Sequence, residues 1–174
     1  MSNNYATLLG VSRFLVRIFR LLNLLTGVLL LGMLVASFLF EPLFLAVFAN
    51  KQPPSIDPGL LLPTLRVWVL LAVPMIAAVH ISLSRLLEMI ETVRAGDPFV
   101  PENAVRLKTI AWCLLATKLL GLAFGAMAAI MNAAGSRIDF EYSWSGWLSV
   151  LLLFVLARVF EEGTRIRGDL EAMV

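Results

Sequence analysis

The sequence predicts an all-α integral membrane protein with four transmembrane helices and both termini in the cytoplasm. Three observations support this prediction: a composition that is 60% hydrophobic and 15% charged, the gathering of apolar residues into long runs, and a biased placement of Lys and Arg. Soluble domains are about 45–50% apolar and about 25% charged, so an ordinary cytosolic domain is excluded. The single cysteine, Cys113, allows neither an internal disulfide nor a Cys-based zinc site.

Four apolar stretches are candidates for membrane spans, because a helix needs about 20 apolar residues to cross roughly 30 Å of hydrocarbon. The expected spans are residues 21–40, 63–87, 109–131 and 146–162. They form a single domain, a four-helix bundle, and residues 163–174 follow it as a cytoplasmic tail. Backbone groups at this depth need internal hydrogen bonds, which helices provide.

Basic residues set the orientation, because Lys and Arg are enriched in cytoplasmic loops. They precede the first span, fill the connection between the second and third, and follow the fourth: Arg13, Arg17, Arg20, Arg85, Arg94, Arg106, Lys108, Arg158, Arg165 and Arg167. The opposite side holds only Lys51, Arg66 and Arg137. Both termini and the central connection are therefore expected in the cytoplasm, with Tyr142, Trp144 and Trp147 at the outer interface.

Local signals mark the ends of the expected helices. The first helix begins before the bilayer, where Arg13, Arg17 and Arg20 share one face at i, i+4 and i+7 spacing. We interpret this face as a positive-inside anchor, with docking or binding of anionic lipid as the alternative. The second helix is expected to stop at Gly96, and Asn103 to cap the third helix.

Lys118 is the most unusual residue of the spans. It lies ten residues past Lys108, about 15 Å along a helix and near mid-bilayer. A lysine there costs about 2.5–3.5 kcal/mol on insertion scales, so it is expected to face protein or water. Gly121 and Gly125 form a GxxxG pair for helix packing, and Lys118 is only about 20° from Gly125. We favour packing within the chain over a homodimer.

A polar stripe follows one face of the second helix. His80, Ser84, Glu88 and Glu91 recur at i, i+4, i+8 and i+11. Together with Lys118, the first three define a candidate intramembrane polar site. The alternative is that these side chains only hold the helices together.

Arg158 lies in the short fourth span, about 18 Å along a helix that begins at Gly146. It is therefore expected to lie within the hydrocarbon and to need an acidic partner. Glu161 and Glu162 are available on the same helix, and Glu88 on the second. We expect a buried ionic cluster here, either as structural contacts or as part of a docking site.

The chain lacks the sequence motifs of common enzymes. It contains no Gly-x-Ser-x-Gly, no Gly-rich phosphate loop and no His-Glu-x-x-His. His80 is the only histidine, and no thiol or carboxylate stands beside it at metal-ligand spacing. We therefore expect a protein that is not an enzyme, uses no metal or cofactor and does not bind nucleic acid directly.

Two segments carry a resemblance to a known family. Residues 96–112 begin Gly-Asp-Pro-Phe-Val-Pro-Glu-Asn, and residues 157–171 read Ala-Arg-Val-Phe-Glu-Glu-Gly-Thr-Arg-Ile-Arg-Gly-Asp-Leu-Glu. Together they resemble a family of bacterial integral membrane proteins of unknown function, over nearly the whole chain. The resemblance implies a multi-pass protein of the bacterial inner membrane. Family members are frequently encoded beside a very small helix-turn-helix regulator, which implies a membrane partner or tether for such a regulator.

The resemblance gives the cytoplasmic face a candidate role in docking. The central connection and the tail offer charged groups around an apolar anchor: Asp97, Phe99, Glu102, Arg158, Glu161, Glu162 and Asp169. A small DNA-binding protein is basic where it meets phosphate, so an acidic membrane surface would compete with DNA for that face. Ile166, Leu170, Met173 and Val174 lie at roughly helical spacing, so the tail is either a docking helix or a helix end that packs on its own domain.

The leading hypothesis is a non-enzymatic membrane partner of a small helix-turn-helix transcription regulator. The alternative is a small transporter or ligand sensor that uses Lys118 and the stripe from His80 to Glu91. A third hypothesis is a structural subunit of a larger membrane complex. The hypotheses separate at Lys118, because Lys118→Met is expected to abolish transport and to spare docking.

Overall fold

The described chain is almost entirely helical. The structure is a computed structural model that describes residues 2–49, 58–133, 135, 138–140 and 144–171. Its helices are α1 (Ser2–Leu39), α2 (Glu41–Ala49), α3 (Pro58–Arg94), α4 (Pro101–Ala133) and α5 (Ser145–Glu171). The prediction of an all-α protein is confirmed, since no residue within these described ranges lies in a strand.

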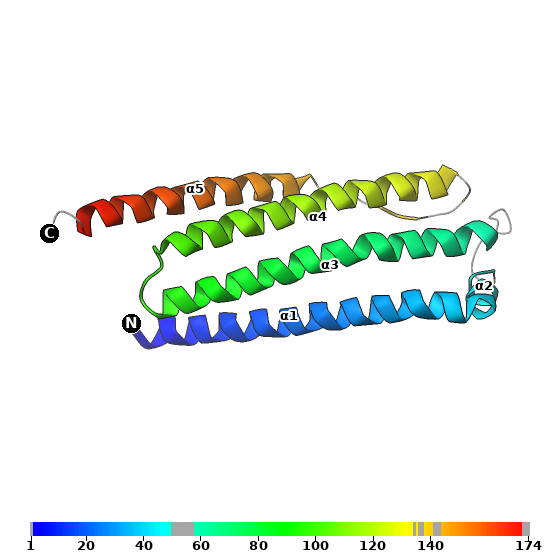
Figure 1. Cartoon of the computed structure of the whole chain (residues 1–174), viewed down its shortest axis with the longest axis horizontal. Coiled ribbons are helices and arrows are strands. Elements are labelled where there is room, and N and C mark those ends of the chain that lie inside the picture. The colour runs from blue at the N-terminus through cyan, green and yellow to red at the C-terminus, as the bar shows by residue number, and fades with distance from the viewer. Residues whose placement is uncertain (1, 50–57, 134, 136–137, 141–143, 172–174) are drawn as a thin grey trace.

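The four long helices lie in a row in chain order: α1, α3, α4 and α5 (Figure 1). Each long helix contacts its neighbours in this row, and the short α2 packs against α1 and α3 at one end. Within the described helices, α1 contacts neither α4 nor α5, and α3 does not contact α5. The arrangement is therefore an open row, whereas the sequence had predicted a bundle.

Large apolar side chains cover the outside of the row. On α1, Leu21 is 67% exposed and Leu29 is 65% exposed, and Leu148 and Leu151 on α5 are each 61% exposed. In water such a continuous apolar surface is rare, but lipid tails are as apolar as leucine and provide no force that closes a bundle. Within the residues that the structure describes, three helices contain stretches long and apolar enough to cross a membrane: Thr7–Leu39, Leu61–Arg94 and Pro101–Ala133.

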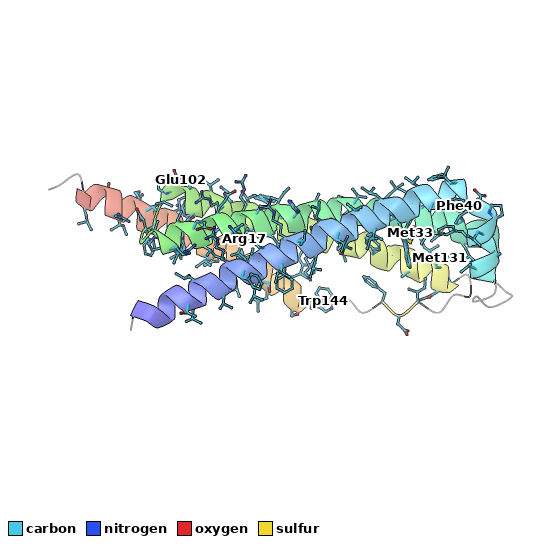
Figure 2. The ribbon with its side chains drawn as sticks, turned by 90° about the horizontal axis from the view of Figure 1, so that it is seen from below. Arg17, Met33, Phe40, Glu102, Met131 and Trp144 are labelled. Atoms are coloured by element: carbon cyan, nitrogen blue, oxygen red, sulfur yellow. The ribbon has the colours of Figure 1, made fainter. Side chains whose placement is uncertain are left out.

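The helix α5 is not among these three candidate spans, although the sequence predicted a fourth span over residues 146–162. It begins halfway along α4, because Gly146 lies directly against the end of the Lys118 side chain. Trp144, labelled in Figure 2, therefore lies beside the middle of α4 and not at its outer end. The helix then runs on to Glu171, so most of the expected tail is a continuation of α5.

The turn between α3 and α4 follows the prediction at its first half only. Gly96 has a φ of +86° and ends α3 as expected, with its N–H bonded to the carbonyl of Val93 and the N–H of Asp97 bonded to that of Thr92. However, α4 begins at Pro101, where the fixed φ of proline suits a first helical turn. The capping role predicted for Asn103 is therefore wrong.

A close seam joins α1 to α3. Asn23 donates a hydrogen bond of 3.1 Å to the carbonyl of Ile76. Gly27 packs so tightly that a Cβ there would lie 3.2 Å from Cγ2 of Ile76. Further along, Arg13 forms an ion pair of 2.7 Å with Glu91. Two polar contacts and one glycine thus fix how α1 lies along α3.

Candidate functional site

The α3–α4 connection is fastened to α5. The ring of Phe99 lies 5.4 Å from that of Phe160, and a Cβ on Gly163 would meet Phe99 at 3.4 Å. Asp97 forms an ion pair with Arg167. The candidate docking site has residues in the α3–α4 connection and residues on α5. Since α3 and α5 make no direct contact, it is these contacts that join the two sets of residues. The structure thus brings the predicted docking residues Asp97 and Phe99 into contact with α5.

An open groove of about 380 Å³ runs between α4 and α5 beside this connection. Ala104 and Lys108 of α4 line one wall, and Ala157, Arg158 and Glu161 of α5 line the other. The walls are apolar at the base and charged at the rim. Such a groove suits contact with a mixed polar and apolar surface.

The arginines of α5 neutralise much of the acidic charge expected at this end. Arg158 pairs with Glu161 at 3.0 Å, and Arg165 pairs with Glu162 at 2.6 Å. Two other docking candidates are exposed and have no ion-pair partner in the described part of the chain: Glu102 and Asp169. The surface is therefore mixed in charge, with two free carboxylates.

The buried ionic cluster expected around Arg158 is absent from the described residues. The Arg158 side chain is 75% exposed and has no contact with Glu88. The reason is the position of α5: because the helix begins beside Lys118, Arg158 has reached the end of α4, where it lines a groove with Lys108 and Pro101.

Glu88 instead links α3 to α4. It pairs with Arg106 at 2.9 Å across the helices and with Arg85 at 3.0 Å on its own helix. Arg106 also donates a hydrogen bond of 2.8 Å to Oδ1 of Asn103. This predicted site residue therefore belongs to a structural network.

Asn103 is the centre of that network, and only 1% of it is exposed. Its Nδ2 donates to Oγ1 of Thr92 at 2.7 Å and to the carbonyl of Pro98 at 2.9 Å. The amide thereby joins α3, the connection and α4. Sequence reasoning identified the residue but assigned it the wrong role, since it expected a helix cap.

The remaining members of the predicted polar stripe lie apart from Lys118. Ser84 donates its hydroxyl hydrogen to the carbonyl of His80 at 2.8 Å, within α3. His80 lines hollows between α1 and α3. Lys118 lies between a different pair of helices, α4 and α5. The structure therefore does not bring these residues together into one site.

Of the predicted glycine pair, only Gly125 makes a close contact, and it meets Phe140 and not another long helix. A Cβ on Gly125 would lie 2.7 Å from Cε1 of Phe140, whereas one on Gly121 would meet no atom within 4 Å. Lys118 lies on the Gly125 side and reaches Gly146. Gly125 thus makes room for the ring of Phe140, and Gly146 makes room for Lys118.

Arg66 makes a dense set of contacts that sequence reasoning missed. It donates to the carbonyl of Ser37 at 2.6 Å and to the Oε2 of Glu41 at 2.9 Å. Its guanidinium also lies 3.9 Å from the centre of the Phe38 ring. The contacts tie α1, α2 and α3 together. The sequence did contain a signal for these contacts. Arg66 lies in the first turns of an apolar helix, and Glu41 lies at the end of the preceding apolar helix, on the same side of the membrane.

These features are those of a helical membrane protein in which the α3–α4 connection packs against α5, at the end where α1 begins and α5 ends. A family model described as "Protein of unknown function (DUF2975)" matches residues 45–174. The chain belongs to this family. Searches of the curated proteins and of the solved structures found no match.

Proposed function

We propose that this protein is a non-enzymatic inner-membrane partner that tethers a small helix-turn-helix transcription regulator at its cytoplasmic face. The class of partner comes from the resemblance described above, whose members are frequently encoded beside such a regulator. The expected docking residues are Asp97, Phe99, Glu102, Arg158, Glu161, Glu162 and Asp169.

The observation that carries this proposal is the end of α5. Gly163 packs against Phe99 in the connection, so the helix beyond it projects past the start of α4 (Figure 1). Ile166 is 52% exposed and Leu170 is 58% exposed on this projecting part. Four residues apart, they form an apolar stripe on one face. A helix with such a stripe is a common binding element for a partner protein.

The charges beside the stripe suit a basic partner. Asp169 adjoins Leu170, and Glu102 lies exposed at the start of α4. A DNA-binding protein carries Lys and Arg on its phosphate-facing surface. Binding to these carboxylates would compete with DNA, so the membrane protein would hold the regulator away from its operator.

Site-specific crosslinking in cells tests the proposal. A photoreactive residue placed at Leu170 is expected to crosslink to a small helix-turn-helix protein, identified by mass spectrometry. Leu119 is the matched control position, because it is 53% exposed on α4 within a candidate span. Operator DNA added to isolated membranes is expected to reduce the crosslink. Equal labelling at both positions, or products that contain no such regulator, would contradict the tether.

The second candidate is a small transporter or ligand sensor, and the observation in its favour is Lys118. Its ammonium group lies against the first turn of α5, where helix N–H groups also attract anions. Lys118→Met would abolish transport or ligand response and leave the Leu170 crosslink intact. Loss of the Leu170 crosslink when Ile166→Glu is added, with normal behaviour of Lys118→Met, would favour the tether.

A further inference from the structure

The seam between α1 and α3 contains an elongated apolar groove. It encloses about 340 Å³. Leu24, Val28 and Leu31 of α1 form one side, and Val73 and Ile81 of α3 form the other. The groove is open to the outside of the protein, so an apolar ligand from a bilayer can enter it.

A polar hollow of about 480 Å³ continues the groove toward the start of α1. The two spaces share Leu24 and His80, so they lie next to each other along the seam. The hollow is lined by Arg17 and Arg20 of α1. The seam is thus apolar along one part and basic at its mouth; Arg17 is labelled in Figure 2.

The polar groups at this mouth are not occupied by the protein itself. Arg17 and Arg20 are both exposed, and neither has an ion-pair partner among residues 2–49, 58–133 and the other described parts. By contrast, their neighbour Arg13 is paired with Glu91. His80 has a buried Nδ1 atom with no hydrogen-bond partner. The guanidinium groups of Arg17 and Arg20 therefore remain available to a ligand, whereas the Nδ1 atom of His80 is not exposed.

We propose that this seam binds one molecule of an anionic phospholipid. The two arginines bind the phosphate, an acyl chain lies in the apolar groove, and His80 lines the place where the two spaces adjoin. Basic pockets between membrane helices are known sites for anionic headgroups. This proposal is independent of the tether function, because the seam lies two helices away from α5.

The dimensions of the seam agree with this occupant. Arg20 and Leu31 are separated by about 16 Å along α1 at 1.5 Å per residue. Half of a typical hydrocarbon core is about 15 Å thick. A phosphate at Arg20 therefore places the end of the acyl chain near Leu31, where the apolar groove ends.

The test compares binding of phosphatidylglycerol and phosphatidylcholine, which differ in headgroup charge. Purified full-length protein is equilibrated with equal amounts of the two lipids, and bound lipid is counted by native mass spectrometry. We expect one tightly retained phosphatidylglycerol. Arg17→Gln combined with Arg20→Gln should reduce the preference roughly tenfold, because each basic residue near a headgroup contributes severalfold. Arg165→Gln is the control and should leave it unchanged.

A second pair of variants tests the groove. Ala77 is exposed and lines it, so Ala77→Phe fills the space and should reduce retention of both lipids. Ala116 is exposed on α4, and Ala116→Phe should have no such effect. A photoreactive acyl chain on phosphatidylglycerol should label peptides of α1 and α3.

Four results would overturn the proposal. They are an unchanged lipid preference in the double arginine variant, equal effects of the two phenylalanine variants, and labelling concentrated on α4 and α5. The fourth is displacement of the lipid by glycerol phosphate at an equal concentration, which would indicate a simple anion site. If a second copy of the chain covered the seam, crosslinks between copies would replace the lipid labelling.

Discussion

Asn103 shows how one side chain can join three segments. It is buried, and the three hydrogen bonds of its amide reach Thr92, Pro98 and Arg106. A buried amide is stable only when its polar atoms have partners. This residue therefore fixes the connection between α3 and α4, and through it the position of Phe99.

Replacing Asn103 by Ala is expected to destabilise the protein by about 2 kcal/mol, because the buried partners then lose their hydrogen bonds. The free energy of unfolding in detergent, measured by thermal or denaturant titration, checks this value. Glu102→Gln is the control, since Glu102 is exposed and surface changes cost within about 0.5 kcal/mol. Equal stability of both variants would show that the network contributes nothing.

At the residue scale, the sequence identified unusual side chains more readily than their partners. Lys118 stood out because a charge in an apolar run is costly. Arg66 did not, because its partners Ser37 and Glu41 belong to other helices. The pairing of Glu88 with Arg106 was missed for the same reason. Periodicity along one helix does not specify which side chains face each other across two helices.

At the scale of elements, α5 departs furthest from expectation. Its apolar run was taken for a complete span, yet the helix begins beside Lys118. Residues 138–140 lie back along α4, with Ile138 bonded to Asn132 and Phe140 packed at Gly125. Hydropathy measures how apolar a segment is, but not the depth at which its helix starts. The glycines at 125 and 146 are the signals that a close approach was needed.

The depth of the start of α5 can be measured by cysteine labelling in a Cys113→Ala background. Ala133 ends α4 about 22 Å beyond Lys118 by helix rise, so Ala133→Cys should react quickly with a membrane-impermeant maleimide. Ser145→Cys should react much more slowly, because it begins α5 at the level of Lys118. Equal rates would mean that α5 crosses the whole membrane, as the sequence alone predicted.

At the scale of the whole molecule, composition and apolar runs correctly predicted helices suited to a membrane. They did not predict that the helices form an open row. The sequence predicted a four-helix bundle, but lipid tails are as apolar as the helix surfaces and provide no force that closes the row. Measured along the helix axes, the start of α1 and the end of α5 lie at the same end of the molecule (Figure 1).

This common end is expected to face the cytoplasm, because ten of the basic residues accumulate there. Alkaline phosphatase fused to either terminus should be inactive, and a fluorescent protein fused at the same positions should be bright. A fusion after Ala133 is the control and should show phosphatase activity. An active phosphatase at the C-terminus would contradict the orientation.

The open row also determines how the protein can be built. Because each long helix contacts only those next to it in the chain, every seam is complete as soon as the second of its two helices has been synthesised. Such local topologies form quickly, and stability approximates a sum of neighbouring interfaces, as in repeat proteins. Assembly can therefore proceed in the order of synthesis, and a defect in the last helix leaves the first seam intact.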